Sequence, residues 1–192
     1  MKKTFFALLI VVSAVFSFSE DSLFSMLQND GVIIMNNRDY VPTLTELVDN
    51  AQKSVHAIIY QTGYYPDYPD GEPTYLQDAL ISASARGVKV QIIVDQSSWN
   101  PSSSMKNYEY AEYMRSKGVE VYLDPPDITT HTKVVVIDSS ITVVGSTNWS
   151  FYALAMNNEC AVAVKSKDLA KVYEKFFSQL MLFKSDTLTI QP

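Results

Sequence analysis

Two apolar, β-branched runs stand almost directly next to each other in the sequence, over residues 133–138 and 141–145. Each run has the length and composition of a buried strand. Only Ser139 and Ser140 separate them. Two residues are too few for a crossover between parallel strands, so the runs are expected to pair as an antiparallel hairpin. The hairpin fixes the local direction of the sheet before any other element is considered.

The residues just outside this hairpin are polar and chemically reactive. If the two serines form a two-residue turn, Lys133 lies opposite Ser146 and His131 lies opposite Asn148. Because side chains alternate along a strand, all four would project from the same face, with cross-strand neighbours about 5 Å apart. A histidine, a lysine, a serine and an asparagine gathered in this way are poor core material. The pattern predicts an anion site that contains a nucleophile.

The rest of the chain alternates strand patterns with amphipathic helix patterns. Strands are predicted over 32–35, 54–61, 88–95, 119–123 and 159–164. Helices are predicted to begin at capping boxes at Thr43 and Thr74, to run over 108–117, and to follow Ser166. The last helix would bury Leu169, Val172, Tyr173, Phe176 and Leu180, and residues 62–73 and 100–104 would be loops. This order predicts an α/β fold with a mixed central β-sheet flanked by helices.

Both ends of the chain are expected to lie outside the folded domain. Residues 2–3 are lysines, residues 5–16 are mostly apolar, and small residues at 17 and 19 precede a possible cleavage point before Glu20. This is the layout of a secretory signal peptide. Residues 1–19 are therefore predicted to be removed and the protein to be exported, either periplasmic or secreted. The domain is expected over 20–184, followed by a loose tail over 185–192.

Composition excludes several classes of site. One cysteine and two histidines are too few for a disulfide framework or for the usual Cys/His zinc cages. None of the six glycines belongs to a Gly-rich phosphate loop. Residues 1–19 hold two lysines and no acid, so the exported chain has 13 basic and 21 acidic residues, a formal charge of −8. This acidity argues against strong non-specific binding of nucleic acid, which uses Lys and Arg contacts to phosphates.

The residues around the hairpin spell His131-x-Lys133-x4-Asp138-x6-Gly145-Ser146-x-Asn148. This spacing closely resembles the HKD signature of the phospholipase D superfamily. Asn158-Glu159 before an apolar strand, residues 85–90 before Asp95, and residues 54–60 also resemble landmarks of that family, so that the resemblance covers most of 43–180. With a single copy of the motif, the chain is similar in length and export signal to the family's small secreted endonucleases. The resemblance implies a phospholipase D-like layered fold and hydrolysis of phosphodiester bonds.

The resemblance also implies a role for each residue of the motif. His131 would attack phosphorus and form a phosphohistidine that water then hydrolyses, and a neutral imidazole suits this role near pH 7. Lys133, Asn148 and Ser146 would hold the phosphoryl oxygens. Glu159 would hydrogen-bond the imidazole and fix its tautomer.

Other candidate residues are expected to be structural. Asp138 lies five residues from Lys133 along the strand, roughly 16 Å at the strand rise, too far to touch the same phosphate. Gly145 is likewise interpreted as a structural residue of the motif. His56 lies inside a predicted strand with no motif around it. Cys160 is expected to be a small buried residue of the strand over 159–164.

A tyrosine-rich segment has two open interpretations. Tyr64, Tyr65, Tyr68 and Tyr75 occur among acidic residues, with no basic residue between them. The segment is either a surface loop with half-buried tyrosines or a rim that contacts the substrate.

A reaction through a phosphohistidine needs a second histidine. The family uses two copies of the motif, one histidine as nucleophile and the other as general acid. Because this chain has one copy, the second is expected from another chain across a twofold axis, in a homodimer with a shared active site. The scheme uses no metal ion and no cofactor.

Three functions are therefore open. The first is a metal-independent phosphodiesterase that cleaves nucleic acid, which the small single-motif form favours. The second is a phospholipase D that acts on phospholipid head groups, which demand less positive surface. The third is a catalytically inactive binding protein, against which the intact motif argues.

Overall fold

The computed structural model describes residues 31–190 and places seven strands in one sheet. The strands are β1 (Val32–Ile34), β2 (Ser54–Ile59), β3 (Lys89–Val94), β4 (Glu120–Leu123), β5 (Lys133–Ile137), β6 (Ile141–Gly145) and β7 (Ala161–Lys165). Their order is β1-β7-β6-β5-β2-β3-β4. Strands β2, β3 and β4 are parallel, and the other neighbours are antiparallel. The predicted mixed sheet is confirmed, whereas the predicted signal peptide lies outside the described residues.

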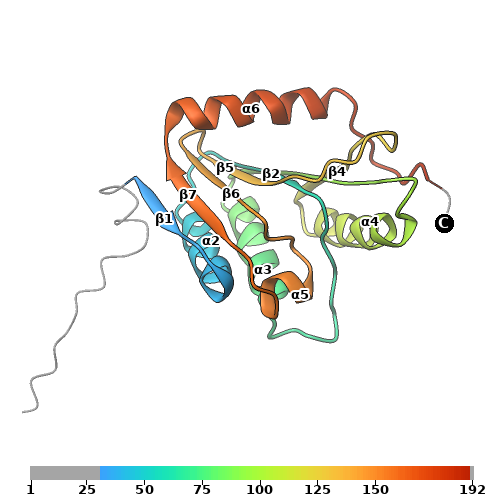
Figure 1. The fold of residues 1–192 in the computed structure, drawn as a ribbon, viewed down its shortest axis with the longest axis horizontal. Coiled ribbons are helices and arrows are strands. Elements are labelled where there is room, and N and C mark those ends of the chain that lie inside the picture. The colour runs from blue at the N-terminus through green and yellow to red at the C-terminus, as the bar shows by residue number, and fades with distance from the viewer. Residues whose placement is uncertain (1–30, 191–192) are drawn as a thin grey trace, which may run out of the picture.

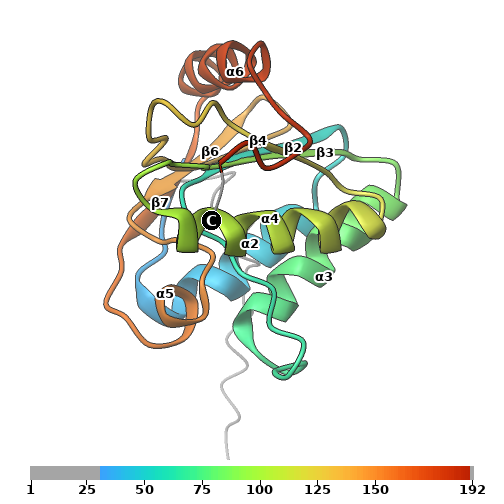
Figure 2. The ribbon, with the colours of Figure 1, turned by 90° about the vertical axis from the view of Figure 1, so that its right-hand side faces the viewer.

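Helices cover both faces of this sheet. They are the 3-10 helix η1 (Asn37–Asp39) and the α-helices α2 (Tyr40–Asp49), α3 (Glu72–Ala85), α4 (Pro101–Ser116), α5 (Phe151–Ala155) and α6 (Lys167–Met181). Figures 1 and 2 show α6 alone on one face and α2, α3, α4 and α5 on the other. The main core lies between the sheet and this second group. Within residues 31–190, no helix is long and apolar enough to span a membrane.

The two predicted capping boxes are wrong. Helix α2 begins three residues before Thr43, whose side chain is buried within the helix. Helix α3 begins just after Gly71, and the hydroxyl of Thr74 donates to the carbonyl of Tyr68 at 3.0 Å. Pro73 occupies the first turn of α3, where its missing N–H costs no helical hydrogen bond. A proline-led first turn therefore replaces the predicted serine/threonine-type cap.

Helix α4 also begins earlier than predicted, because residues 101–104 are helical and not a loop. Pro101 stands at the first helical position, which suits its fixed φ. The side chain of Asn100 accepts a hydrogen bond from the N–H of Ser103 at 3.3 Å and so caps the helix. Three serines made this stretch look like a loop, but proline and a capping asparagine start the helix there.

The predicted register of the hairpin is wrong by one residue. Val134 pairs with Val144 and Ile137 pairs with Ile141, so three residues connect the strands. Lys133 is consequently level with Gly145 and not with Ser146. A two-residue turn at the serines does not form because Asp138 has already left the strand.

Asp138 explains this departure. It adopts a left-handed backbone, with φ 52°, and its carboxylate accepts hydrogen bonds from the backbone N–H groups of Gln52, Lys53 and Ser54 at 2.9, 2.7 and 3.0 Å. These contacts tie the hairpin to the start of β2. Asp138 is far from the hairpin's reactive end, as its position in the sequence indicated.

Helix α6 begins as predicted, with the side chain of Ser166 accepting from the N–H of Leu169 at 3.2 Å. Its buried face is shifted from the predicted one. Val172 is 64% exposed, whereas Phe177 is buried. The reason is tertiary: the ring of Phe177 stacks on His56 of β2, with centroids 4.7 Å apart.

His56 has a structural environment. Its Nδ1 lies 2.7 Å from a carboxylate oxygen of Glu174 on α6, and its ring packs on Phe177. Both contacts hold α6 against the sheet. The position agrees with the structural interpretation of this histidine.

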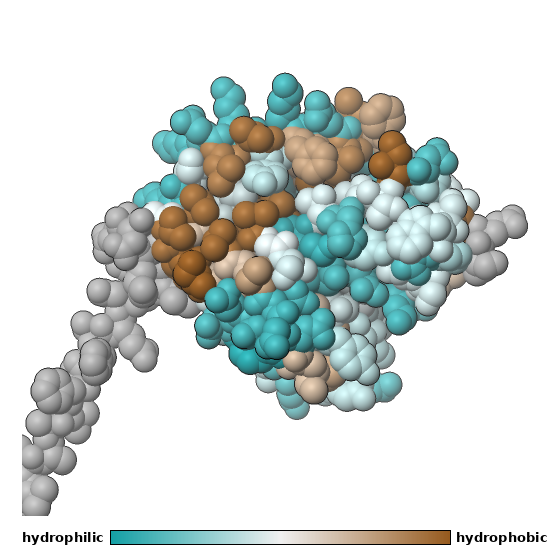
Figure 3. Space-filling view, viewed as in Figure 1, coloured by the Kyte–Doolittle hydropathy of each residue, from teal (hydrophilic) through white to brown (hydrophobic). Residues whose placement is uncertain are grey.

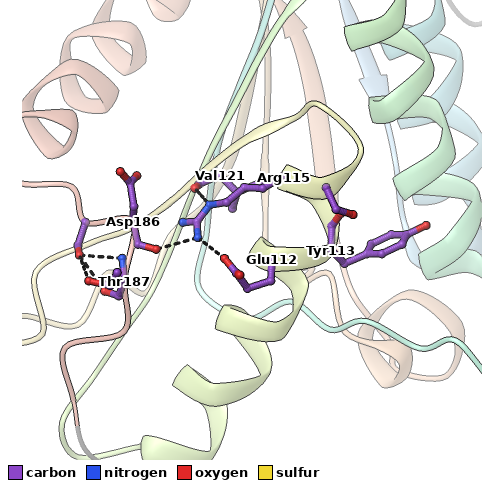
Figure 4. Close-up of polar contacts among 8 residues, drawn as sticks. Glu112, Tyr113, Arg115, Val121, Asp186 and Thr187 are labelled. Carbon is purple, nitrogen blue, oxygen red and sulfur yellow. Dashed lines mark hydrogen bonds and ion pairs between the residues drawn. The ribbon is translucent and has the colours of Figure 1, made fainter.

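The segment after α6 is not a loose tail over the residues described. Ser185 exchanges two backbone hydrogen bonds with Leu123 of β4, at 2.9 and 2.8 Å. The guanidinium of Arg115 donates to the carbonyl of Asp186, to Glu112 and to the carbonyl of Val121, as Figure 4 shows. The end of the described chain is therefore bonded to β4 and α4.

The edge strand β1 presents an apolar surface. Val32 is 46% exposed and Ile34 is 59% exposed. Figure 3 shows apolar side chains gathered on the side of the molecule where β1 and β7 lie. We call Val32 and Ile34 the β1 surface.

Candidate active site

His131 and Lys133 form the first half of the site, at the start of β5. The Nζ of Lys133 lies 3.3 and 3.2 Å from the Nδ1 and Nε2 of His131. The ring of Tyr60, just after β2, lies against both, 4.4 Å from the His131 ring and 4.9 Å from the Lys133 ammonium. The imidazole is exposed, whereas the lysine is buried. An exposed imidazole thus lies against a buried lysine side chain.

Ser146 and Glu159 form the second half, where β6 ends and just before β7 begins. The hydroxyl of Ser146 donates to the carboxylate of Glu159 and accepts from the N–H of Cys160. Gly145 allows this close approach, because a Cβ there would lie 2.3 Å from the carbonyl oxygen of Cys160.

Electrostatics connects the two halves. Burial lowers the pKa of Lys133 from its ordinary value, and the negative charges of Glu159 and Asp95 oppose that shift. The charges of two carboxylates therefore favour the protonated form of this lysine. Such a group can take up the negative charge of a phosphodiester in place of water.

The predicted hydrogen bond between Glu159 and His131 is not formed among residues 31–190. The carboxylate of Glu159 instead accepts from Ser146 and from the side-chain amide of Asn157, the latter at 3.1 Å. Its two oxygens are thereby engaged, and the ring nitrogens of His131 are contacted by Lys133. In this structure Glu159 orients the serine and not the imidazole.

Asn148 lies beside this cluster and has no hydrogen-bond partner for its Oδ1 within residues 31–190, although that atom is buried. The next residue, Trp149, is buried and its N–H donates to the carbonyl of Gln61 at 2.8 Å. This bond anchors the turn that carries Asn148. Asn148 also lines a cavity bounded by aromatic residues.

The sequence analysis did not assign Thr130 to the site, and it treated Tyr60 and Asp95 only as landmarks of the family. The buried carboxylate of Asp95 accepts from the N–H of Thr130, the neighbour of His131, at 2.7 Å. Burial raises its pKa, and a hydrogen bond from Ser97 is the largest opposing effect. A usable signal existed, because Tyr60 and Asp95 directly follow the parallel strands β2 and β3, where sites of α/β folds gather.

Two further expectations concern Cys160 and the tyrosine-rich segment. Cys160 is exposed, because β7 begins only at the next residue, so the prediction of a buried cysteine is wrong. Tyr65 and Tyr68 line the cavity beside Asn148, whereas Tyr75 lies outside it on α3 and is 51% exposed.

Among residues 31–190 there is no group of three or more His, Cys, Asp or Glu side chains placed to hold a metal ion.

Comparisons with solved structures show the same fold. Nuc from Salmonella typhimurium, described as a phospholipase D family member, superposes with a TM-score of 0.68 at 21% identity, over 82% of this chain and 98% of that one. NucT from Helicobacter pylori superposes with a TM-score of 0.62 at 22% identity, over 80% and 96% of the two chains.

Comparisons of sequence identify the family. A phospholipase D of Rickettsia conorii is 29% identical over 126 residues, which cover 66% of this chain and 56% of that protein. The mitochondrial cardiolipin hydrolase of Xenopus tropicalis is 30% identical over 105 residues, covering 55% and 48%. The chain thus spans about half the length of these curated relatives. The family model described as "Cardiolipin synthase, PLD-like domain" matches residues 44–181, so the chain belongs to the phospholipase D-like family.

Proposed function

We propose that this protein is a phosphodiester hydrolase that works without a metal ion, with His131 as the nucleophile. The observation that carries the proposal is the exposed imidazole of His131 in contact with the buried ammonium of Lys133. Such a pair offers an attacking nitrogen and a cation for the phosphoryl oxygens within one small volume. Family membership supports the same reaction class.

The proposed reaction has two steps. First, a ring nitrogen of His131 attacks phosphorus, the phosphorus–oxygen bond to the leaving group breaks, and a general acid protonates the departing oxygen. Water then attacks the phosphohistidine, the phosphorus–nitrogen bond breaks, and the imidazole is regenerated. Lys133 and Asn148 would stabilise the non-bridging oxygens through N–H donors, and Ser146 would join them when its hydroxyl turns from Glu159 to the phosphate.

The general acid is proposed to be His131 of a second copy of the chain, in a homodimer with a shared site. The apolar β1 surface supports this assembly because it is an exposed apolar strand edge, and the segment that follows β1 bonds to Glu159. Ile34 is three residues before Asn37, whose backbone and side chain both bond to Glu159. A partner that covers this surface would bury exposed apolar area close to the catalytic residues.

Nucleic acid is the proposed substrate, and phospholipid is the second candidate. The nuclease proposal rests on the resemblance to the family's small secreted endonucleases. The superposition with this chain covers 98% of Nuc and 96% of NucT, which agrees with a single small domain. The phospholipase D relatives support the alternative. The layout of residues 1–19 further supports export to the periplasm or the medium.

A trapping experiment tests the reaction. The protein is incubated with a phosphodiester labelled at phosphorus, quenched with base, and analysed by peptide mapping. We expect label on His131 that is lost in acid, and none in His131→Ala. Turnover should continue in EDTA; loss on chelation that a divalent ion restores, or label on another residue, would contradict the scheme.

A panel of substrates tests the class. Single-stranded DNA, double-stranded DNA, RNA and vesicles of phosphatidylcholine or phosphatidylglycerol are supplied to the same preparation at low salt. Cleavage of a nucleic acid supports the proposal. Release of lipid head groups without any cleavage of nucleic acid would place phospholipid first.

A further inference from the structure

A cavity of about 390 Å³ opens beside the motif residue Asn148. Its lining residues include Gln61, Tyr65, Tyr68, Lys106, Asn148 and Phe151. Gln61 directly follows Tyr60, the residue that contacts both His131 and Lys133. Asn148, which is proposed to hold a phosphoryl oxygen, is itself part of this lining, so a group attached to the reacting phosphate has a binding place next to it.

Several contacts connect the aromatic residues that line this cavity. The hydroxyl of Tyr65 accepts from the N–H of Phe151 at 3.0 Å, and the ring of Tyr68 lies 5.4 Å from that of Phe151. The end of the Tyr65 side chain packs directly on Gly63, where a Cβ would lie 2.4 Å from the Tyr65 hydroxyl. The side chain of Gln77 donates to the carbonyl of Gly63 at 3.0 Å and holds the loop. Tyr65 is thus held by a hydrogen bond, and Tyr68 packs against Phe151.

The polar residues of the cavity include three side-chain amides and one cation, besides the hydroxyl groups of Ser150 and the tyrosines. Gln61, Asn148 and Asn157 contribute side-chain amides, and Lys106 is the charged residue of the lining. The Oδ1 of Asn148 is buried without a hydrogen-bond partner within residues 31–190. Aromatic faces, amides and a cation together match a nucleobase with an attached phosphate.

The same lining disfavours common phospholipid head groups. Lys106 would repel the cationic ends of choline and ethanolamine. On the other side of Phe151, a second hollow is lined by Asp67, Asp70 and Glu72, which repel phosphate. A polyanion is therefore directed past Lys106 and away from these acids.

We propose that this cavity binds the nucleobase next to the reacting phosphate, stacked on Phe151 and Tyr68, with Lys106 contacting the following phosphate. The inference rests on the proposed phosphodiesterase function and names its substrate as an unpaired nucleotide, either in a single strand or at a strand end. A paired base cannot leave its stack to enter the cavity without losing its partner.

Two chromogenic esters with the same leaving group test the base contact. One is thymidine 5′-(p-nitrophenyl phosphate) and the other is methyl p-nitrophenyl phosphate, which lacks base and sugar. For Phe151→Leu and Tyr68→Ala, we expect the ratio of kcat/KM for the thymidine ester to that for the methyl ester to fall about 10-fold. Tyr75→Ala, an exposed tyrosine outside the cavity, is the matched control and should keep the wild-type ratio.

A second comparison tests Lys106. Lys106→Ala should raise the KM of a p-nitrophenyl ester of a dinucleotide, which has an additional phosphate, several-fold more than the KM of the mononucleotide ester. Wild-type ratios in Phe151→Leu, Tyr68→Ala and Lys106→Ala would overturn the inference while turnover of the methyl ester still supported the proposed function. A selective loss of phosphatidylglycerol turnover in these variants would also overturn it.

A binding measurement separates the two proposals if neither ester is hydrolysed. That result would count against the proposed hydrolase, and the cavity is then tested by fluorescence titration with thymidylyl-thymidine. Binding that weakens about 10-fold in Phe151→Leu but not in Tyr75→Ala would support the nucleobase site. Absence of binding would overturn it.

Discussion

Asn37 and Glu159 are joined by hydrogen bonds in both directions. The N–H of Asn37 donates to the carbonyl of Glu159 at 3.0 Å, and the N–H of Glu159 donates to the Oδ1 of Asn37 at 2.8 Å. Asn37 adopts a left-handed backbone, with φ 51°, which asparagine tolerates better than most residues. The short segment between β1 and α2 thereby holds the residue that bonds the hydroxyl of Ser146.

Asn37→Gly isolates this contact, because glycine accepts the left-handed backbone and removes only the side-chain acceptor. Glu159 would then be held less firmly, and we expect kcat/KM to fall about 10-fold with a change in Tm of only a few degrees. Steady-state kinetics and thermal unfolding measure both effects. Asn36→Ala is the control, since its side chain makes no capping bond, and equal losses in the two variants would contradict a positioning role.

Lys133→Met removes the ammonium that contacts His131 and replaces it with an apolar chain of similar length. The phosphoryl charge would lose its buried cation, so we expect turnover to fall by at least roughly 100-fold while the protein remains folded. Turnover of p-nitrophenyl esters and circular dichroism report the two properties. Retained turnover in a folded Lys133→Met would remove this lysine from the proposed mechanism.

Asp138→Asn tests the role of the third motif residue. Asparagine tolerates the left-handed backbone but offers one acceptor oxygen in place of a charged carboxylate that binds three N–H groups. We expect the free energy of unfolding to fall by about 1–3 kcal/mol, with kcat of the folded protein largely retained. Urea unfolding gives the first quantity. A large loss of kcat at unchanged stability would show that Asp138 acts in catalysis.

The buried carboxyl of Asp124 makes stability depend on pH. Burial raises its pKa to about 7, and the charge of Asp95 acts in the same direction, against hydrogen bonds that include the N–H of Gln96. Since the folded pKa lies above the unfolded value, the contribution of this group is fully present below about pH 4 and is lost as pH rises through about 7.

Asp124→Asn should therefore gain stability over the wild type as pH rises from about 5 to about 8, by up to a few kcal/mol. Urea unfolding of both proteins at each pH gives the difference between their free energies of unfolding. Titrating groups that the two proteins share cancel in this difference. A constant difference across this range would contradict the raised pKa.

Ile34→Asp tests the proposed homodimer. A charge on the β1 surface would cost association free energy without entering the core, because Ile34 is 59% exposed. We expect light scattering to give twice the chain mass for the wild type and the mass of one chain for the variant, with loss of turnover. Val172→Asp on α6 serves as the exposed apolar control. A fully active monomeric wild type would contradict the shared site.

The sequence by itself determined the class of fold and the centre of the site. β-Branched runs such as those at β3 and β5 predict buried strands because apolar side chains without polar alternation must be covered on both faces. Residue type and spacing point to His131, Lys133, Ser146 and Asn148 as candidates, whereas Glu159 is a candidate through the resemblance to the phospholipase D superfamily. Local pattern suffices for these features, since it reports burial and chemistry directly.

Only the tertiary structure decided the contacts between distant segments. Asp138 sets the hairpin register through backbone groups of residues 52–54, which the turn residues do not reveal. Glu159 bonds Ser146 and Asn157 and is held by Asn37, far away in the sequence. The physical reason is the same in each case: a hydrogen bond between remote segments depends on how the whole chain brings them together, and no local pattern encodes that distance.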